Sequence, residues 1–258
     1  MTALPELRER LRRYYTAYYR DTLGIPDWAT LVGLREGEER LEAQHVERVR
    51  RLLGPSALAG RLLNVGCGTG GFNVHAAEVG ARAVGVDESR EAMAICALKA
   101  RKTGGPFVQA QAETLPFRDG AFDLVYCYSV IEHVASVERT VAEMVRVTRS
   151  GGAIYLHTPN AWSCWEGHYK VFWLPFLPQP LGRWYLRLRG RPVTYLASLR
   201  RLRPGRLRRA FAEAGVTALT FHRGTPARES VGPLRRLTGL YYRLTGVSPF
   251  IELVARKP

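Results

Sequence analysis

Three closely spaced glycines give the chain its clearest chemical signal. Gly66, Gly68 and Gly70 follow a short apolar run at residues 62–65 and precede a helix-compatible segment. Glycine has no Cβ, so such a turn can adopt positive φ and lets a ligand approach the backbone closely. With Gly71 counted, the stretch also fits the pattern G-x-G-x-x-G, so the loop alone does not separate nicotinamide dinucleotides from other adenosine-bearing ligands.

An aspartate follows this turn at a spacing typical of ribose recognition. A second apolar segment, residues 81–86, ends on Asp87, about 20 residues beyond the turn, where nucleotide-binding sheets place a carboxylate. A carboxylate at this point can accept hydrogen bonds from both ribose hydroxyls. The alternative is an exposed aspartate that caps the helix starting near Ser89.

A third block of sequence, residues 110–134, extends the pattern. Together with the glycine turn and the segment around Asp87, this block resembles the class I S-adenosylmethionine-dependent methyltransferases, especially the branch of ubiquinone and menaquinone biosynthesis enzymes. The resemblance covers about the middle 100 residues of the chain, with the motifs in the family's order.

The resemblance implies S-adenosylmethionine as cofactor and assigns residues to it. In the family, Glu113 meets the amino edge of adenine; the alternative is a solvated loop carboxylate. Asn64 departs from the family, which usually has an acidic residue there that helps to orient the glycine loop; an amide keeps a hydrogen bond but supplies no charge. The implied cofactor-binding residues are Asn64, Gly66, Cys67, Gly68, Gly70, Asp87, Glu88, Ala112, Glu113, Tyr128, Ser129 and Val130.

Three histidines are candidates for the proton acceptor that a hydroxyl substrate needs. The sulfonium already activates its methyl group, so the enzyme supplies alignment, a dry pocket and a base. His133 comes first, because imidazole titrates near neutral pH and the family places this position near the transferred methyl. The alternative is a histidine that fixes its turn by bonding to backbone. His157 and His168 are secondary candidates, and no ligand spacing supports a metal, so we expect none.

An α/β sheet must position these residues. Apolar runs alternate with helix-compatible segments, which predicts a Rossmann-like, doubly wound sheet of seven strands with a helical cap insertion. The resemblance adds that the sheet is mostly parallel and that its last strand, residues 250–255, is antiparallel. Helices are expected at residues 4–19 and 36–53. We expect a single methyltransferase domain over residues 1–258, divided into N-terminal helices (1–55), a cofactor-binding core (56–159), an acceptor cap (160–209) and the C-terminal part of the sheet (210–258).

The first helix carries two pairs of tyrosines one turn apart, at residues 14–15 and 18–19. In related enzymes the N-terminal helices close over the cofactor and shape the acceptor pocket. The alternative is a helix that packs on the sheet through its aromatic stripe.

The formal charge of +15 is concentrated in the last third of the chain. Residues 160–258 hold 18 Lys and Arg against 4 Asp and Glu, whereas residues 61–159 hold 10 of each. The cap also alternates aromatic, leucine and arginine residues, as expected of a surface at an anionic membrane interface or around an anionic amphiphile. The alternative is a local aromatic core with arginines in water. No signal segment or membrane span is evident, so we expect a cytoplasmic protein, with peripheral contact at the inner membrane face left open.

The leading functional hypothesis is O-methylation of a small-molecule or lipid-linked hydroxyl acceptor. A basic RNA-binding methyltransferase is the alternative favoured by the charge, although no N-P-P-Y loop or RNA-binding module is present, so nucleic acid is not the expected partner. A non-catalytic peripheral membrane protein that keeps the fold, and an oxidoreductase, complete the alternatives. The sequence leaves the acceptor, the methylated atom and the oligomeric state undetermined.

Overall fold

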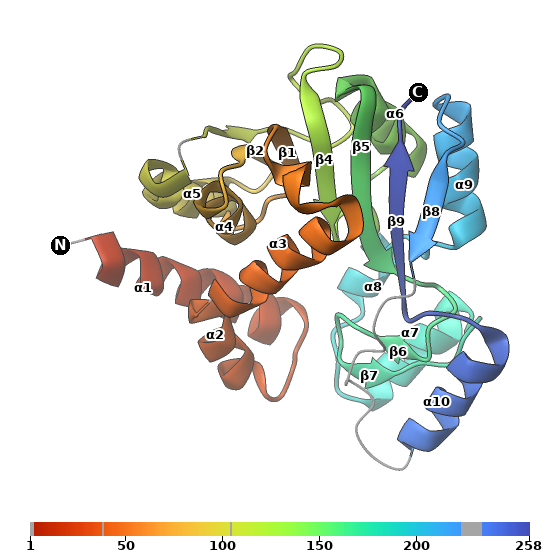
Figure 1. Ribbon diagram of the computed structural model, residues 1–258. Helices are drawn as coiled ribbons and strands as arrows, with labels where there is room; N and C mark the ends of the chain where they lie inside the picture. Colours follow the sequence, from red (N-terminus) through yellow and green to blue (C-terminus); the bar gives the residue numbers. More distant parts are fainter. Residues whose placement is uncertain (1–2, 38, 104, 223–233) are drawn as a thin grey trace.

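A seven-stranded sheet forms the centre of the computed structural model, which describes residues 3–37, 39–103, 105–222 and 234–258 (Figure 1). The strand order is β3-β2-β1-β4-β5-β9-β8. Among these strands only β9 is antiparallel to its neighbours, and it lies between β5 and β8. The strands are β1 (Arg61–Val65), β2 (Arg82–Asp87), β3 (Phe107–Gln109), β4 (Phe122–Tyr128), β5 (Thr148–Pro159), β8 (Leu219–His222) and β9 (Phe250–Arg256).

Helices cover both faces of the sheet and extend below its lower edge in Figure 1. A two-stranded sheet of β6 (Trp165–Glu166) and β7 (Val171–Phe172) lies in the cap. The helices are α1 (Ala3–Thr16), η1 (Ala17–Thr22), α2 (Trp28–Glu36), α3 (Glu39–Leu53), η2 (Pro55–Leu58), α4 (Gly71–Glu78), α5 (Arg90–Thr103), α6 (Val137–Val147), α7 (Gln179–Leu188), α8 (Thr194–Ser198), α9 (Pro204–Glu213) and α10 (Leu234–Thr245).

The central strands are apolar on both sides because each face of the sheet is covered. Successive side chains of a strand point to opposite faces, so neighbours Leu62 and Leu63 of β1 join different cores. Leu63 packs in the core that includes Val141 of α6 and Phe211 of α9, and Leu62 packs with Val49 of α3. The predicted fold class, a doubly wound sheet with an antiparallel last strand, is confirmed.

A third core joins the N-terminal helices to the cap. Leu23 and Val32 from the N-terminal region pack with Tyr169, Trp173 and Leu186 from the cap. Two regions far apart in sequence therefore form one layer over the lower ends of the parallel strands, which Figure 1 shows below the sheet. A core within the cap, the alternative considered for its aromatic residues, is present, and the N-terminal region supplies four of its ten buried residues.

The helix expected at residues 36–53 begins three residues later than expected. Helix α2 ends at Glu36, Gly37 follows it in a non-helical conformation, and α3 begins at Glu39. Glycine is a weak helix former with a high entropic cost, and the break lets the two helices take different directions. No helix among the described residues is both long enough and apolar enough to cross a bilayer.

Candidate functional site

The glycine turn after β1 has the backbone that only glycine adopts easily. Gly66, Gly68 and Gly70 have φ values of 69°, 52° and 79°. A Cβ on Gly66 would lie 2.1 Å from Cγ2 of Val130, so the close approach of the β4 loop requires glycine here. A Cβ on Gly68 would meet nothing within 4 Å, which leaves the backbone open to a ligand at this point.

This turn lines a cavity of about 750 Å³ at the carboxyl ends of the parallel strands. Ligands of open α/β sheets bind at this edge, and the volume lies within the range of small-molecule sites. The cavity brings together most of the residues expected from the sequence. Those that line it are Gly66, Gly68, Asp87, Glu88, Ala112, Glu113, Ser129, Val130 and His133.

Asp87 lies at the end of β2 and links the cavity to the glycine turn. Its Oδ2 accepts the backbone N–H of Gly68 at 2.9 Å, and its Oδ1 accepts the N–H of Ser89 at 2.9 Å. The capping group of α5 is Ser89 itself, whose Oγ accepts the N–H of Ala92 at 3.2 Å. A carboxylate offers about four acceptor directions, so Asp87 keeps capacity for hydroxyl groups of a ligand.

The sequence predicts cofactor contacts for Asn64, Cys67 and Gly70, but these three residues do not line the cavity. Asn64 is buried in β1, and its amide donates to Oδ1 of Asn73 in α4 at 2.7 Å. Cys67 and Gly70 instead pack toward α5 and β3, where a Cβ on Gly70 would lie 3.0 Å from Sγ of Cys96. The amide of Asn64 therefore holds α4 against β1 rather than facing a ligand.

Tyr128 and His157 are also placed away from the cavity. The centroids of their stacked rings are 4.1 Å apart. The ring centroid of His45 lies 4.3 Å from that of Tyr128, and the ring centroid of Phe250 lies 4.8 Å from that of His157. Strand alternation explains this, because both side chains point to the face of the sheet that α3 covers. Burial lowers the pKa of His157 to about 3. Neither His157 nor Tyr128 lines the larger cavity, so this placement does not support the expected roles of His157 as a base and of Tyr128 as a cofactor contact.

Glu113 lines the cavity, but its carboxylate is engaged differently from the expectation. Oε1 accepts the backbone N–H groups of Ala135 at 2.7 Å and of Ser136 at 3.3 Å, just before α6 begins. Since these amides lie at a helix N-terminus, an anionic side chain is favoured there. The carboxylate fixes the turn after His133, and no contact with an adenine edge follows from it.

Tyrosines of the N-terminal helix close the cavity from the opposite side. Tyr14 and Tyr18 line it, and the hydroxyl of Tyr14 hydrogen-bonds to the side chain of Ser89. Tyr18 hydrogen-bonds to Tyr195 of the cap at 3.1 Å, between the two hydroxyl oxygens. The tyrosine pairs one turn apart were the sequence signal for this contact. Tyr195 had no such signal, because only the fold brings the cap to this wall.

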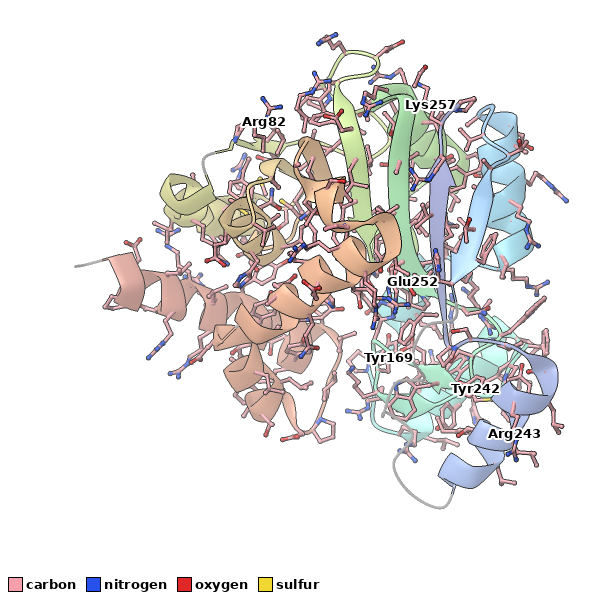
Figure 2. The ribbon with its side chains drawn as sticks, viewed as in Figure 1. Arg82, Tyr169, Tyr242, Arg243, Glu252 and Lys257 are labelled. Carbon is pink, nitrogen blue, oxygen red and sulfur yellow. The ribbon has the colours of Figure 1, made fainter. Side chains whose placement is uncertain are left out.

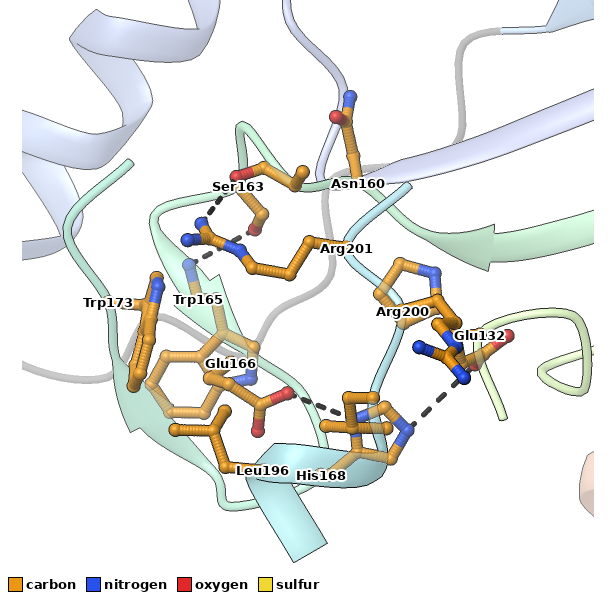
Figure 3. Close-up of a pocket in the computed structure, with 13 residues that line it drawn as sticks. Glu132, Asn160, Ser163, Trp165, Glu166, His168, Trp173, Leu196, Arg200 and Arg201 are labelled. Carbon is orange, nitrogen blue, oxygen red and sulfur yellow. Dashed lines mark hydrogen bonds and ion pairs between the residues drawn. The ribbon is translucent and has the colours of Figure 1, made fainter. Parts of the chain in front are cut away.

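A carboxylate and two histidines meet where the cavity borders the cap. Oε1 of Glu132 lies 3.8 Å from Nε2 of His168 (Figure 3) and 3.9 Å from Nε2 of His133. This Oε1 is buried and has no hydrogen-bond partner among the residues that the structure describes, while Oε2 accepts the hydroxyl of Thr158 at 2.9 Å. His168 is oriented in turn by Glu166, whose Oε1 lies 2.9 Å from its Nδ1.

The protonation states of this cluster differ from those of the same groups in water. Burial, and secondly the nearby His168, lowers the pKa of His133 to about 4, so its imidazole is neutral at pH 7. Burial raises the pKa of Glu132 to about 7. Burial opposes the charging of His168, but the hydrogen bond and charge of Glu166 and the charge of Glu132 outweigh it and raise the pKa of His168. The cluster therefore exchanges protons near neutral pH.

A second, smaller cavity of about 60 Å³ lies on the cap side of the cluster. Glu132 and His168 line it together with Trp165 and Trp173 of the cap (Figure 3). Arg200 lines both this cavity and the larger one. The small volume accommodates only the reacting group of an acceptor, so the rest of such a molecule must extend outward from the cap.

Glu132, His133 and His168 also form a set that a metal could bind. Their ligand atoms lie within 4.8 Å of one another, and no other described residues form such a group. Two imidazoles and one carboxylate suit divalent transition metals. The sequence spacing gave no sign of this set because the cap supplies one of the three groups. The absence of a metal stays a prediction.

Fold and site together define the class of the domain. Residues 63–156 match the family model described as a methyltransferase domain. The chain therefore carries a class I S-adenosylmethionine-dependent methyltransferase domain, with S-adenosylmethionine as its cofactor. The residues present fit this group, because the backbone at Gly68 is open and Asp87 retains acceptor directions beside a cavity of sufficient volume.

Individual relatives show how far the likeness extends. The chain is 35% identical over 102 residues to a ubiquinone biosynthesis O-methyltransferase of Rhizobium rhizogenes, over 39% of this chain and 41% of that protein. It is 33% identical over 134 residues to norajmaline N-methyltransferase of Rauvolfia serpentina, over 50% of this chain and 46% of that protein. The chain thus matches less than half the length of these curated relatives.

A solved S-adenosylmethionine-dependent methyltransferase from Mesorhizobium loti shares the fold. It superposes with a TM-score of 0.58 over 81% of this chain and 96% of that chain, at 19% identity. Identity at this level supports the fold only, so the acceptor must be argued from the site.

Proposed function

We propose that the protein transfers a methyl group from S-adenosylmethionine to a hydroxyl of a small-molecule or lipid-linked acceptor. The observation that carries this proposal is the cluster of Glu132, His133 and His168 between the larger cavity and the cap cavity. A proton-accepting group at the border of a cofactor site and an acceptor site is what O-methylation needs, whereas transfer to a neutral amine needs no base before attack.

The chain's own residues would hold the cofactor at the larger cavity. Asp87 would accept the ribose hydroxyls, and the open backbone at Gly68 would lie against the ligand. Tyr14 of α1 and Tyr18 of η1 would cover it. When bound, the cofactor supplies a methyl group already activated on a sulfonium. The protein therefore needs to align the acceptor, exclude water and receive one proton.

His133 is the residue that would take this proton. Its imidazole lines the larger cavity and is neutral at pH 7, so it has a lone pair to offer. The imidazolium formed would be stabilised by Oε1 of Glu132, which is 3.9 Å away and accepts no hydrogen bond from the described residues. His168 and Thr158 would act on this step only by positioning the Glu132 carboxylate.

Mass spectrometry can test the proposed reaction. Fractionated lipids, small metabolites and RNA from cells are incubated with the protein and with S-adenosylmethionine that carries a trideuterated methyl group. We expect labelled product in the lipid or metabolite fraction, and loss of the label with His133→Gln but not with His75→Gln, a histidine paired with Glu78 on the surface of α4.

Other outcomes assign the alternatives. Label confined to RNA supports the RNA-methyltransferase hypothesis. Binding of the cofactor without label in any fraction supports a non-catalytic protein that keeps the fold. Either result contradicts the proposed hydroxyl acceptor.

A further inference from the structure

Exposed apolar side chains are concentrated at one end of the molecule. Of the ten large apolar residues that the described structure exposes, eight belong to the segments 174–188 and 237–244. The other two, Leu34 and Val79, lie singly on α2 and α4. Scattered exposed leucines are ordinary in proteins, whereas a gathered set marks an interaction surface.

Helix α7 presents an apolar stripe to solvent. Leu181, Trp184 and Leu188 are exposed by 53%, 60% and 65%, at the i, i+3, i+7 spacing that places them on one helix face. The opposite face is packed, since Leu186 is fully buried and Gly182 lies against the ring of Trp173. The residues of the stripe are therefore not part of the packed core of the cap.

Helix α10 repeats this arrangement. Leu237, Leu240 and Leu244 have the same spacing and are exposed by 63%, 41% and 75%. The helix is attached through its other side, where the hydroxyl of Tyr242 accepts the N–H of Cys164 at 2.8 Å and that of Tyr241 donates to the carbonyl of Trp162 at 3.0 Å. Figure 2 labels Tyr242 on this helix, at the lower end of the molecule.

The two helices border one surface. The backbone carbonyl of Trp162 accepts the hydroxyl of Tyr241 from α10. The ring centroid of Trp162 lies 6.2 Å from that of Phe176, an exposed residue that precedes α7 by a few positions. Both helices lie below the strands in Figure 1. We call the exposed apolar residues of the segments 174–188 and 237–244, together with Arg201, Arg203, Arg206 and Arg209, the lower face.

Arginines form an anion-binding hollow at the edge of the lower face. The hollow has a volume of about 390 Å³ and is lined by Ala161, Phe176, Arg201, Arg203, Arg206 and Arg209. Arg206 is paired with Glu138, and Arg201 donates to the carbonyls of Leu177 and Ala161. Neither α7 nor the described part of α10 contains an acidic residue. Phosphate is the group that this density of guanidinium recognises best.

We propose that the lower face docks on an anionic lipid bilayer, with the stripes of α7 and α10 in the interfacial region and lipid phosphates in the arginine hollow. Amphipathic helices with leucine and tryptophan on one side and arginine on the other bind such surfaces. A second copy of the chain fits less well, because it brings a like charge of +15. Nucleic acid would use the arginines but leave the leucine stripes exposed.

The docked orientation places the acceptor site beside the bilayer. The hollow and the small cap cavity share Ala161 and Arg201 as lining residues, so the two adjoin at these residues. A lipid-borne hydroxyl would thus reach Glu132 and His168 while its chain stays in the membrane. This last step rests on the proposed function, whereas the docking itself does not.

Vesicle co-sedimentation tests the docking. The full chain is mixed with vesicles of phosphatidylcholine alone or of phosphatidylcholine with phosphatidylglycerol. We expect binding to the anionic vesicles that falls as salt is added, because charge attraction is screened. The Trp184→Glu/Leu188→Glu variant and the Arg203→Ser/Arg209→Ser variant should each lose about ten-fold or more in affinity.

Matched controls distinguish vesicle binding through the lower face from binding through the overall positive charge of the protein. Leu34→Ser removes an exposed leucine of α2, and Arg82→Ser removes an exposed arginine far from the lower face (Figure 2); both should bind vesicles like the parent. Retained binding of S-adenosylmethionine shows that each variant is folded. If neither the parent nor any variant binds S-adenosylmethionine, the result counts against the proposed function and not against the docking. Three results would overturn the docking proposal. They are vesicle binding by both double variants that equals binding by the parent, binding of inorganic phosphate without binding of vesicles, and self-association of the chain through the leucine stripes.

Discussion

Asp87 has two roles at the residue scale, because its carboxylate both accepts from the glycine turn and faces the cavity. Replacing it with alanine should weaken S-adenosylmethionine binding by about 1–3 kcal/mol, the cost of leaving buried hydroxyls unpaired. Equilibrium dialysis with labelled cofactor measures this. Glu47→Ala, which removes an exposed carboxylate of α3, is the control. Unchanged affinity in the Asp87 variant would refute the ribose assignment.

The buried Glu132 gives the protein a pH-dependent stability. Burial raises its pKa in the folded chain from 4.5 to about 7, so between these values the native state holds a proton that the unfolded chain has released. Because the lowered pKa values of His133 and His157 contribute in the opposite direction, it is the Glu132 contribution, rather than the total stability, that must fall as pH rises through this window. The raised pKa of His168 acts in the same direction, because its stabilising charge is lost at higher pH.

The variant Glu132→Gln should reduce this fall by about 1–3 kcal/mol. Urea unfolding at pH 5 and pH 8 compares the two proteins, with Glu47→Gln as the control for an exposed carboxylate. A Glu132→Gln variant whose stability changes with pH in the same way as that of the parent would show that Glu132 is solvated rather than buried.

Metal removal distinguishes two uses of the Glu132, His133 and His168 cluster. If the cluster accepts protons, as proposed, dialysis against a chelator leaves methyl transfer unchanged. Loss of activity that added zinc or manganese restores would assign the cluster to a metal instead. Elemental analysis of the purified protein gives an independent reading.

Residue-level prediction succeeded where the signal was local. The glycine turn and Asp87 follow from spacing alone, since a turn and a strand end are fixed by neighbouring residues. Tyr128 and His157 lie on the face of the sheet that α3 covers, because strand alternation decides the face each side chain occupies and spacing along the chain does not show it. The partners of Glu132 and Glu113 come from distant segments, which no spacing reveals.

At the scale of elements, α1 acts as a cover for the cofactor cavity. Its Tyr14 lines the cavity together with Tyr18 of the following η1, and its Tyr15 hydrogen-bonds to Thr69 of the glycine turn at 3.0 Å. A ligand that bridges this helix to the sheet must stabilise it in place. Strands and most helices were predictable from their apolar patterns, but the break at Gly37 and the core shared by cap and N-terminal helices depend on tertiary contacts.

Limited proteolysis tests the covering role of α1. Exposed arginines, including Arg10 and Arg13, offer trypsin sites on this helix. We expect saturating S-adenosylhomocysteine to slow cleavage there, and Tyr14→Ala to reduce the protection. Cleavage rates that ignore the ligand would favour the alternative, a helix that only packs through its aromatic side chains.

At the scale of the whole molecule, charge and chemistry are separated. The core, residues 61–159, carries equal numbers of acidic and basic residues and holds the cofactor cavity, while the excess positive charge lies in the last third. This division was visible in the sequence. What only the fold shows is that the arginine hollow adjoins the cap cavity, which connects the basic surface to the cluster of Glu132 and His168.

Calorimetric titration of the unmodified chain tests the central claim that the larger cavity is an S-adenosylmethionine site. We predict saturable binding of S-adenosylmethionine at one site per chain, and no heat of binding for NADH under the same conditions. Binding of NADH with no response to S-adenosylmethionine would contradict this account, because the glycine turn would then serve a dinucleotide.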